Sequence, residues 1–202
     1  MKYSVLIVYL CIISLIPNIT QAQGCLQADV ALLIDWSGSE AGNESLLIEA
    51  AQAFIDKLSL GEDEVKVTLL TFNAWAHTWC SLTSDRVKLQ KGLDKMKETS
   101  PIGGTYLHDP LMFVKAEFSK DKRNVTRIII IVSDGEIFDI DTAIEILTDI
   151  RETFPTVVYC IQIGGTQKDL YNLFRLSGSI ENVGVSSAKE LANDLKSLSL
   201  CN

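Results

Sequence analysis

The chain has 202 residues, of which 47% are hydrophobic and 22% are charged, a composition typical of a folded globular protein. A formal net charge of -8 without any basic cluster argues against nucleic acid and against anionic membrane surfaces as partners. The length is that of one domain. A domain of this size buries roughly 70% of its unfolded surface and does not need disulfides or metals to hold its core.

The first 22 residues have the pattern of a secretory signal peptide. Lys2 supplies a positive start, the stretch from Val5 to Ile16 is apolar, and Thr20-Gln21-Ala22 offers a small-residue cleavage site. A retained membrane anchor is the alternative, but the apolar run is shorter than the roughly 20 residues that a bilayer span requires. We therefore expect a signal peptide over 1–22 and a mature, secreted, extracellular chain that does not insert into membranes.

Apolar runs and helical periodicities alternate along the rest of the chain. Strands are predicted at 30–35, 65–72, 74–82, 127–133, 156–163 and 180–185. Helices are predicted at 44–58, 87–96, up to about 119 after the loop at 100–105, and at 140–153, 167–175 and 188–199. The second and third strands are joined so tightly that they must form an antiparallel hairpin. The alternation of the other strands with helices predicts an α/β fold with a mostly parallel sheet.

Short oxygen-bearing side chains follow two of the apolar strands. Asp35, Ser37 and Ser39 come directly after the first strand, and Asp134 follows the strand at 127–133. Ligands of open α/β sheets bind beyond the carboxyl ends of the strands, and oxygen ligands suit a hard cation such as Mg²⁺. A plain helix cap at Ser37 or Ser39 is the alternative for the first segment taken alone.

Together with a glycine-rich loop between them, these segments resemble the von Willebrand factor A domain, also known as the integrin I domain. The likeness extends over about residues 28 to 200, and the segments that match the three loops of that family's metal-ion-dependent adhesion site are Asp35-Trp36-Ser37-Gly38-Ser39, Gly103-Gly104-Thr105 and Ser133-Asp134-Gly135. The resemblance implies one domain over 23–202 with a doubly wound, mostly parallel six-stranded sheet. Its strand order would be 3-2-1-4-5-6, with strand 3 as an antiparallel edge and helices on both faces.

The resemblance also implies a role for each matching residue. Ser37 and Ser39 would ligate the metal directly. Thr105 would do so directly or through water, and Asp35 and Asp134 would act largely through water. The implied ion is Mg²⁺, with Mn²⁺ or Ca²⁺ as alternatives, and a Glu or Asp side chain of an extracellular partner would fill its open coordination position.

This sequence departs from the family's pattern beside the first loop. Trp36 stands where a small or polar residue is usual, and Glu40 stands where an aliphatic one is usual. Neither change removes a ligand oxygen, but both bear on the shape and charge of the rim.

Four cysteines remain once the signal peptide is removed, and four cysteines allow three pairings. In the family's topology Cys25, before the first strand, and Cys201, after the last helix, lie on the side opposite the metal loops, which implies a Cys25–Cys201 disulfide. Cys80 on strand 3 and Cys160 on strand 5 would lie four strand spacings apart, roughly 19 Å, and stay unpaired. Cys160 is expected to be a small buried side chain, while an exposed Cys80 available for self-association stays an open alternative.

The predicted function is a secreted adhesion or protein-binding module, and two alternatives stand beside it. One is an extracellular matrix structural or assembly module with metal-independent contacts. The other is an enzyme built on Ser37, His108 and Asp134, which is disfavoured because the chain has no Gly-x-Ser-x-Gly elbow and a hydroxyl committed to a metal is not poised beside a base. The sequons at Asn43 and Asn124 predict glycosylation, in keeping with export.

Overall fold

The computed structural model describes residues 27–197. Its six strands are β1 (Ala28–Asp35), β2 (Val65–Phe72), β3 (Ala76–Thr83), β4 (Thr126–Ser133), β5 (Thr156–Ile163) and β6 (Val183–Ser186). Its α-helices are α1 (Glu44–Lys57), α2 (Arg86–Met96), α3 (His108–Lys120), α4 (Ile140–Thr153), α5 (Gln167–Ser177) and α6 (Leu191–Ser197). Two short 3-10 helices, η1 (Gly38–Glu40) and η2 (Ile180–Asn182), precede α1 and β6.

The strands form one sheet in the order β3-β2-β1-β4-β5-β6, which confirms the predicted order. β3 runs antiparallel to β2, and all other pairings are parallel. β1 lies between β2 and β4, so the winding of the chain reverses between β1 and β4. Ligands of doubly wound sheets bind at such a reversal, because the loops on its two sides leave the sheet in opposite directions.

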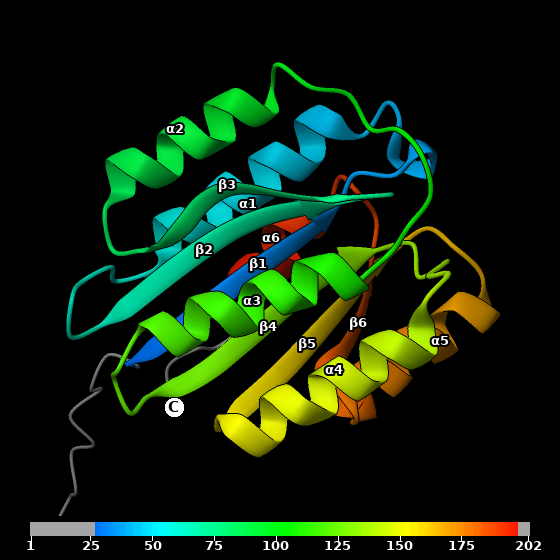
Figure 1. Ribbon diagram of the computed structural model, residues 1–202. Coiled ribbons are helices and arrows are strands. Elements are labelled where there is room, and N and C mark those ends of the chain that lie inside the picture. Colours follow the sequence, from blue (N-terminus) through cyan, green and yellow to red (C-terminus); the bar gives the residue numbers. More distant parts are fainter. Residues whose placement is uncertain (1–26, 198–202) are drawn as a thin grey trace, which may run out of the picture.

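Helices cover both faces of the sheet (Figure 1). Alternate residues of β1 point to opposite faces, as the pleat of a strand requires. Val30, Leu32 and Ile34 join the buried cluster that includes residues of α1, α2 and α6. Ala31 and Leu33 join the cluster that includes residues of α3, α4 and α5. Because β1 is buried on both faces, it reads in the sequence as a continuous apolar run rather than as an alternation.

The opposite end of the central strands contains a buried ion pair. Arg127 at the start of β4 pairs with Asp29 at the start of β1, and Arg123 pairs with the same carboxylate. The Arg127 guanidinium also donates to the backbone oxygens of Phe118, Asp121 and Arg123. A buried charge needs such partners, so this network fixes the loop before β4 against β1 at the end far from the predicted metal loops.

The two described cysteines are both buried and unpaired. Cys160 lies in the core, as expected, and burial raises the pKa of its thiol to about 12. The alternative prediction of an exposed Cys80 is wrong. Although β3 is an edge strand, the Cys80 side chain packs into the core cluster that includes residues of α2. Cys25 and Cys201 lie outside the described residues, as does the predicted signal peptide, so the Cys25–Cys201 disulfide and the 1–22 signal stay predictions.

No helix within residues 27–197 is long and apolar enough to span a membrane.

Candidate metal-ion site

The loop after β1 turns back on its own side chains. The Oδ1 atom of Asp35 accepts a hydrogen bond of 2.9 Å from the backbone N–H of Ser37, and the chain then enters η1. This places the hydroxyl oxygens of Ser37 and Ser39 only 3.0 Å apart. Asp35 and Ser37 are buried, whereas Ser39 is exposed. The alternate spacing of the three residues therefore gathers their oxygens at the carboxyl end of β1.

The end of β4 is joined directly to Asp35. The hydroxyl of Ser133 donates a hydrogen bond of 2.6 Å to Oδ2 of Asp35, and the backbone N–H of Gly135 donates to the same hydroxyl at 3.0 Å. Asp134 is buried beside them, and its Oδ1 accepts from the backbone N–H of Glu136. No role was predicted for Ser133 beyond its place in the motif, yet its side chain connects the ends of the two central strands.

The glycine-rich loop before α3 lies across these two strand ends (Figure 1). The backbone N–H of Gly38 donates to the carbonyl of Gly103 at 2.9 Å, and that of Ile102 donates to Trp36 at 2.9 Å. The carbonyl of Thr105 accepts from the N–H of Phe138, in the loop after β4, at 3.0 Å. Thr105 itself is buried. Hydrogen bonds thus tie this loop to both of the others.

Glycines lie at two places where these loops meet. Gly103 has a φ of 80°, which disfavours any residue with a Cβ. A Cβ on Gly104 would lie 2.5 Å from the ring of Phe138, so this exposed side chain would have to move aside. The glycines therefore allow the loop to pass close to Phe138 and bring Thr105 to the mouth of the sheet.

The donor set fits a hard divalent cation. Two cis ligands of an octahedral Mg²⁺, each at about 2.1 Å, lie about 3 Å from one another, which is the separation of the Ser37 and Ser39 hydroxyl oxygens. Within residues 27–197 no three His, Cys, Asp or Glu side chains gather as a metal-binding group. A metal at this edge would therefore depend on hydroxyl oxygens, as the Asp-x-Ser-x-Ser spacing predicts, with the carboxylates close behind them.

Burial dominates the electrostatics of the carboxylates. Loss of hydration raises the pKa of Asp35 to about 6, against the hydrogen bonds from Ser133 and Ser37, and the negative charge of Asp134 raises it further. Removing water from a carboxylate penalises its charged form, and a second nearby carboxylate adds to that penalty. A cation among these groups would offset both effects, which is the electrostatic counterpart of the geometric fit.

Glu40 is a buried acidic side chain that the sequence did not predict. It is only 2% exposed although it follows the exposed Ser39. Burial raises its pKa to about 7, the hydrogen bond from Nδ2 of Asn43 at 3.1 Å opposes this rise, and the charges of Asp35 and Asp134 add to it. Glu40 is therefore electrostatically coupled to the strand-end carboxylates rather than projecting from the rim.

Trp36 also lies inside the protein rather than on the rim. Its side chain is buried in the cluster shared with α1, and its indole N–H has no hydrogen-bond acceptor among the described residues. The exposed aromatic rings around the loops come instead from Trp75, Tyr106 and Phe138. The sequence pattern alone does not distinguish the buried Trp36 from the exposed aromatic residues, because each of them stands beside a turn.

The hydroxyl of Ser37 is not bonded to a histidine. Its hydrogen-bond partner is Ser39, while Nδ1 of His108 lies 2.8 Å from Asp109 on the exposed start of α3. A nucleophilic serine needs a base within hydrogen-bond reach. The geometry therefore gives no support to the triad considered from the sequence.

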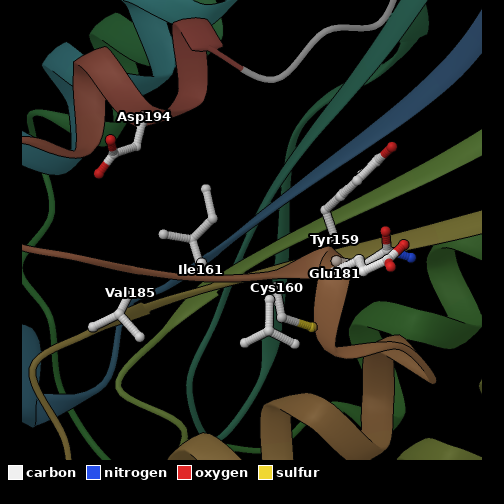
Figure 2. Close-up of a pocket in the computed structure, with 9 residues that line it drawn as sticks. Tyr159, Cys160, Ile161, Glu181, Val185 and Asp194 are labelled. Atoms are coloured by element: carbon white, nitrogen blue, oxygen red, sulfur yellow. The ribbon is translucent and has the colours of Figure 1, made fainter.

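A separate cavity of about 230 Å³ lies along β5 and β6, away from these loops. Figure 2 shows Tyr159 and Ile161 of β5 beside it, with Val185 of β6 and Asp194 of α6 at its border. Cys160 points to the other face of the sheet, as its place in the opposite core cluster requires (Figure 2). No strand-end loop of the candidate metal site contributes a residue to this cavity.

The fold is a doubly wound α/β sheet, and the three loops described above meet at its switch point. Residues 30–136 match the family of von Willebrand factor type A domains, and the chain belongs to that family.

Solved structures of such domains are similar to this chain over most of its length. Proximal thread matrix protein 1 from the mussel byssus matches with 23% identity and a TM-score of 0.71, over 88% of this chain and 47% of that one. The manganese-loaded TRAP protein of Plasmodium vivax matches with 18% identity and a TM-score of 0.69, over 84% and 73% of the two chains. The von Willebrand factor domain of the type V pilus tip protein Mfa5 from Porphyromonas gingivalis matches with 12% identity and a TM-score of 0.72, over 85% and 93%.

At these identities the likeness shows the fold. The chain spans about half the length of the mussel protein, of which another structure has zinc in its MIDAS motif. Domains of this family are generally adhesion or binding modules rather than enzymes.

Proposed function

We propose that this protein is a secreted, non-enzymatic binding module that holds a divalent cation, Mg²⁺ first among the candidates, and uses it to bind an acidic side chain of an extracellular partner. Ser37 and Ser39 would be direct ligands, Thr105 would ligate directly or through water, and Asp35 and Asp134 would act through water. The bound ion would supply an electron-poor centre with one coordination position open to a carboxylate.

The observation that carries the proposal is the pair of hydroxyl oxygens at 3.0 Å beside a carboxylate that joins β1 to β4. Neutral hydroxyls leave the positive charge of a bound cation largely uncompensated in the first shell. The Ser133 bond and the Ser37 backbone bond orient both oxygens of Asp35, so the ligand loop is held before any ion binds. This preorganisation reduces the ordering that binding would otherwise require.

A single charged contact of this kind supports a modest affinity. Association costs several kcal/mol in lost translational and rotational freedom, which one ion-mediated contact must offset. We expect micromolar binding by one site, strengthened where several copies engage the same partner surface.

Metal binding is tested first, without any partner. Protein at a Mg²⁺ concentration 100 times the dissociation constant should gain about 2.7 kcal/mol of stability over protein in chelator. Ser39→Ala removes one ligand oxygen from an exposed side chain and should reduce this gain, and Ser119→Ala, on an exposed serine at the far end of α3, should not. Calorimetry that detects no Mg²⁺ or Mn²⁺ uptake by the secreted wild-type protein would refute the proposal.

Partner binding is tested next, against a panel of extracellular matrix proteins in Mg²⁺ and in chelator. Binding that requires Mg²⁺ and disappears in Ser39→Ala supports the proposal. Binding retained in chelator would favour the second candidate, a structural or assembly module with metal-independent contacts. The observation that favours this candidate is the likeness to a byssal thread matrix protein.

A further inference from the structure

A cavity of about 210 Å³ opens directly beside the candidate metal-ion site. Its walls come from the connection between β2 and β3, from the first turn of α3, and from the start of α4. The lining residues are Ala74, Trp75, Tyr106, His108, Asp109 and Asp139. Tyr106 follows Thr105 in the chain, so the cavity begins one residue from a predicted metal ligand.

The two aromatic walls are held by one residue, Asn73. Its carbonyl accepts a hydrogen bond of 3.0 Å from the N–H of Tyr106, and its side-chain Oδ1 accepts from the N–H of Trp75 at 2.9 Å. The N–H of Asn73 donates to the carbonyl of Trp75 at 3.0 Å. On its other side the ring of Tyr106 meets Phe138 edge to face, with the ring centroids 5.4 Å apart. These contacts fix the cavity relative to Thr105.

Asp139 fixes the third wall and neutralises the positive end of α3. Its two carboxylate oxygens accept from the backbone N–H of Leu107, at 2.9 and 3.1 Å, and from that of His108 at 2.7 Å. These are donor groups at the start of the helix, which otherwise attract anions. Because Asp139 occupies them, the helix start is already supplied with an anion.

The lining has the chemistry of a cation site. It contains two aromatic rings and the carboxylate of Asp109, which lies 2.8 Å from Nδ1 of His108. The Asp139 carboxylate is already occupied by the start of α3, and no lysine or arginine is among the six lining residues. Trp75 is 70% exposed and Tyr106 is 43% exposed, so both rings are accessible to a ligand. Aromatic rings attract cations through the negative potential of their faces, and a guanidinium group also stacks on them.

We propose that this cavity binds an arginine or lysine side chain of the same partner segment whose acidic residue is held at the metal-ion site. The binding of the partner's acidic residue rests on the proposed function, and the binding of its basic residue rests on the cavity. An extended segment advances about 3.3 to 3.6 Å per residue. Since the cavity starts next to Thr105, the basic residue should lie one to three positions from the acidic one in an extended partner.

The first test uses the cavity alone, without metal. N-acetyl-arginine amide is titrated into ¹⁵N-tryptophan- and ¹⁵N-tyrosine-labelled protein secreted from cells expressing the full chain, in chelator and in Mg²⁺, with N-acetyl-citrulline amide as the uncharged probe of the same shape. We expect the Trp75 indole and Tyr106 amide signals to shift with arginine and not with citrulline in both conditions. Asp109→Asn should weaken the arginine effect about two- to fivefold. Asp63→Asn, on an exposed loop, should not change it.

The second test uses peptides with one glutamate at a fixed position and arginine placed at each neighbouring position in turn, each matched to a citrulline peptide, in Mg²⁺. Arginine at one or two adjacent spacings should tighten binding about three- to tenfold. Trp75→Ala should abolish this gain while leaving the binding of the glutamate-only peptide intact. Tyr171→Ala, an exposed aromatic on α5, serves as the matched control.

Two outcomes separate the two proposals. Equal shifts with arginine and citrulline, or an arginine gain that survives Trp75→Ala, would overturn the basic-residue cavity whatever the metal does. Arginine-specific shifts without any Mg²⁺-dependent binding of the glutamate peptides would overturn the proposed function and leave the cavity as a cation site on its own.

Discussion

Replacing Glu40 with glutamine should make the metal-free protein more stable at pH 8. Glu40 is 2% exposed, and burial together with the charges of Asp35 and Asp134 raises its pKa from the ordinary value of 4.5 to about 7. Between these two pH values the folded protein retains a proton that the unfolded chain has released. The free energy of unfolding therefore falls as the pH rises through this window, and the full penalty is present above about pH 7.

The size of the effect follows from the two pKa values. They differ by about 2.5, and a tenfold change in proton affinity is worth about 1.4 kcal/mol, so ionised Glu40 costs the folded state about 3 kcal/mol. Glutamine does not ionise, and its amide oxygen can still accept the hydrogen bond from Nδ2 of Asn43. We expect Glu40→Gln to raise the free energy of unfolding by about 2 to 3 kcal/mol at pH 8, and by only about 1 kcal/mol or less at pH 5, near the start of this window.

Urea unfolding in chelator at pH 5 and pH 8 measures this difference. Glu49→Gln replaces an exposed glutamate on the neighbouring helix α1 and should leave the stability of the protein nearly unchanged at both pH values. A Glu40→Gln variant that gains the same stability at pH 5 as at pH 8, or that is less stable than wild type at pH 8, would refute the electrostatic reasoning.

Three further outcomes test other parts of the structure. Trp36→Phe should stay within about 1 kcal/mol of wild type in urea unfolding, because removing a buried N–H without an acceptor offsets the smaller ring. Enzymatic deglycosylation followed by mass analysis of the separate Asn43 and Asn124 peptides should find more glycan on the exposed Asn124 than on the half-buried Asn43, whose amide nitrogen is bonded to the Glu40 carboxylate. Cys80 and Cys160 should react with a thiol reagent only after denaturation, because both are buried, and a disulfide-linked dimer through Cys80 on a non-reducing gel would contradict this.

The sheet was predictable because its strands are long apolar runs. The predicted limits of β2, β5 and α4 are those of the structure, and the strand order is confirmed. The limits fail where the apolar signal is short. The predicted strand at 180–185 begins with η2, where the hydroxyl of Ser179 accepts from the N–H of Glu181, and only 183–186 pairs with β5. The Ser179 side chain caps η2 and so delays the start of β6, and a hydrophobicity pattern does not detect such a cap.

The candidate site was predictable as a set of three loops but not as a network. The Asp-x-Ser-x-Ser spacing indicates which oxygens follow β1, since alternate residues there leave the same strand end. It does not indicate that Ser133 donates to Asp35 across the sheet, because that contact spans 98 residues and depends on the register of β1 against β4. Nor does it indicate that Glu40 is buried, because the burial of one side chain in a short 3-10 helix depends on what packs over it.

The arrangement of charges at the strand ends explains why one group of residues affects both stability and binding. Asp35 holds β1 and β4 together through Ser133, yet its burial and its proximity to Asp134 penalise its ionised form, and Glu40 carries a similar penalty. The fold without a cation therefore contains uncompensated negative charge at its switch point, which a cation bound among the hydroxyls would offset. Substitutions that remove this charge should stabilise the metal-free fold and weaken cation binding. Stability and cation affinity are therefore expected to change in opposite directions across the site.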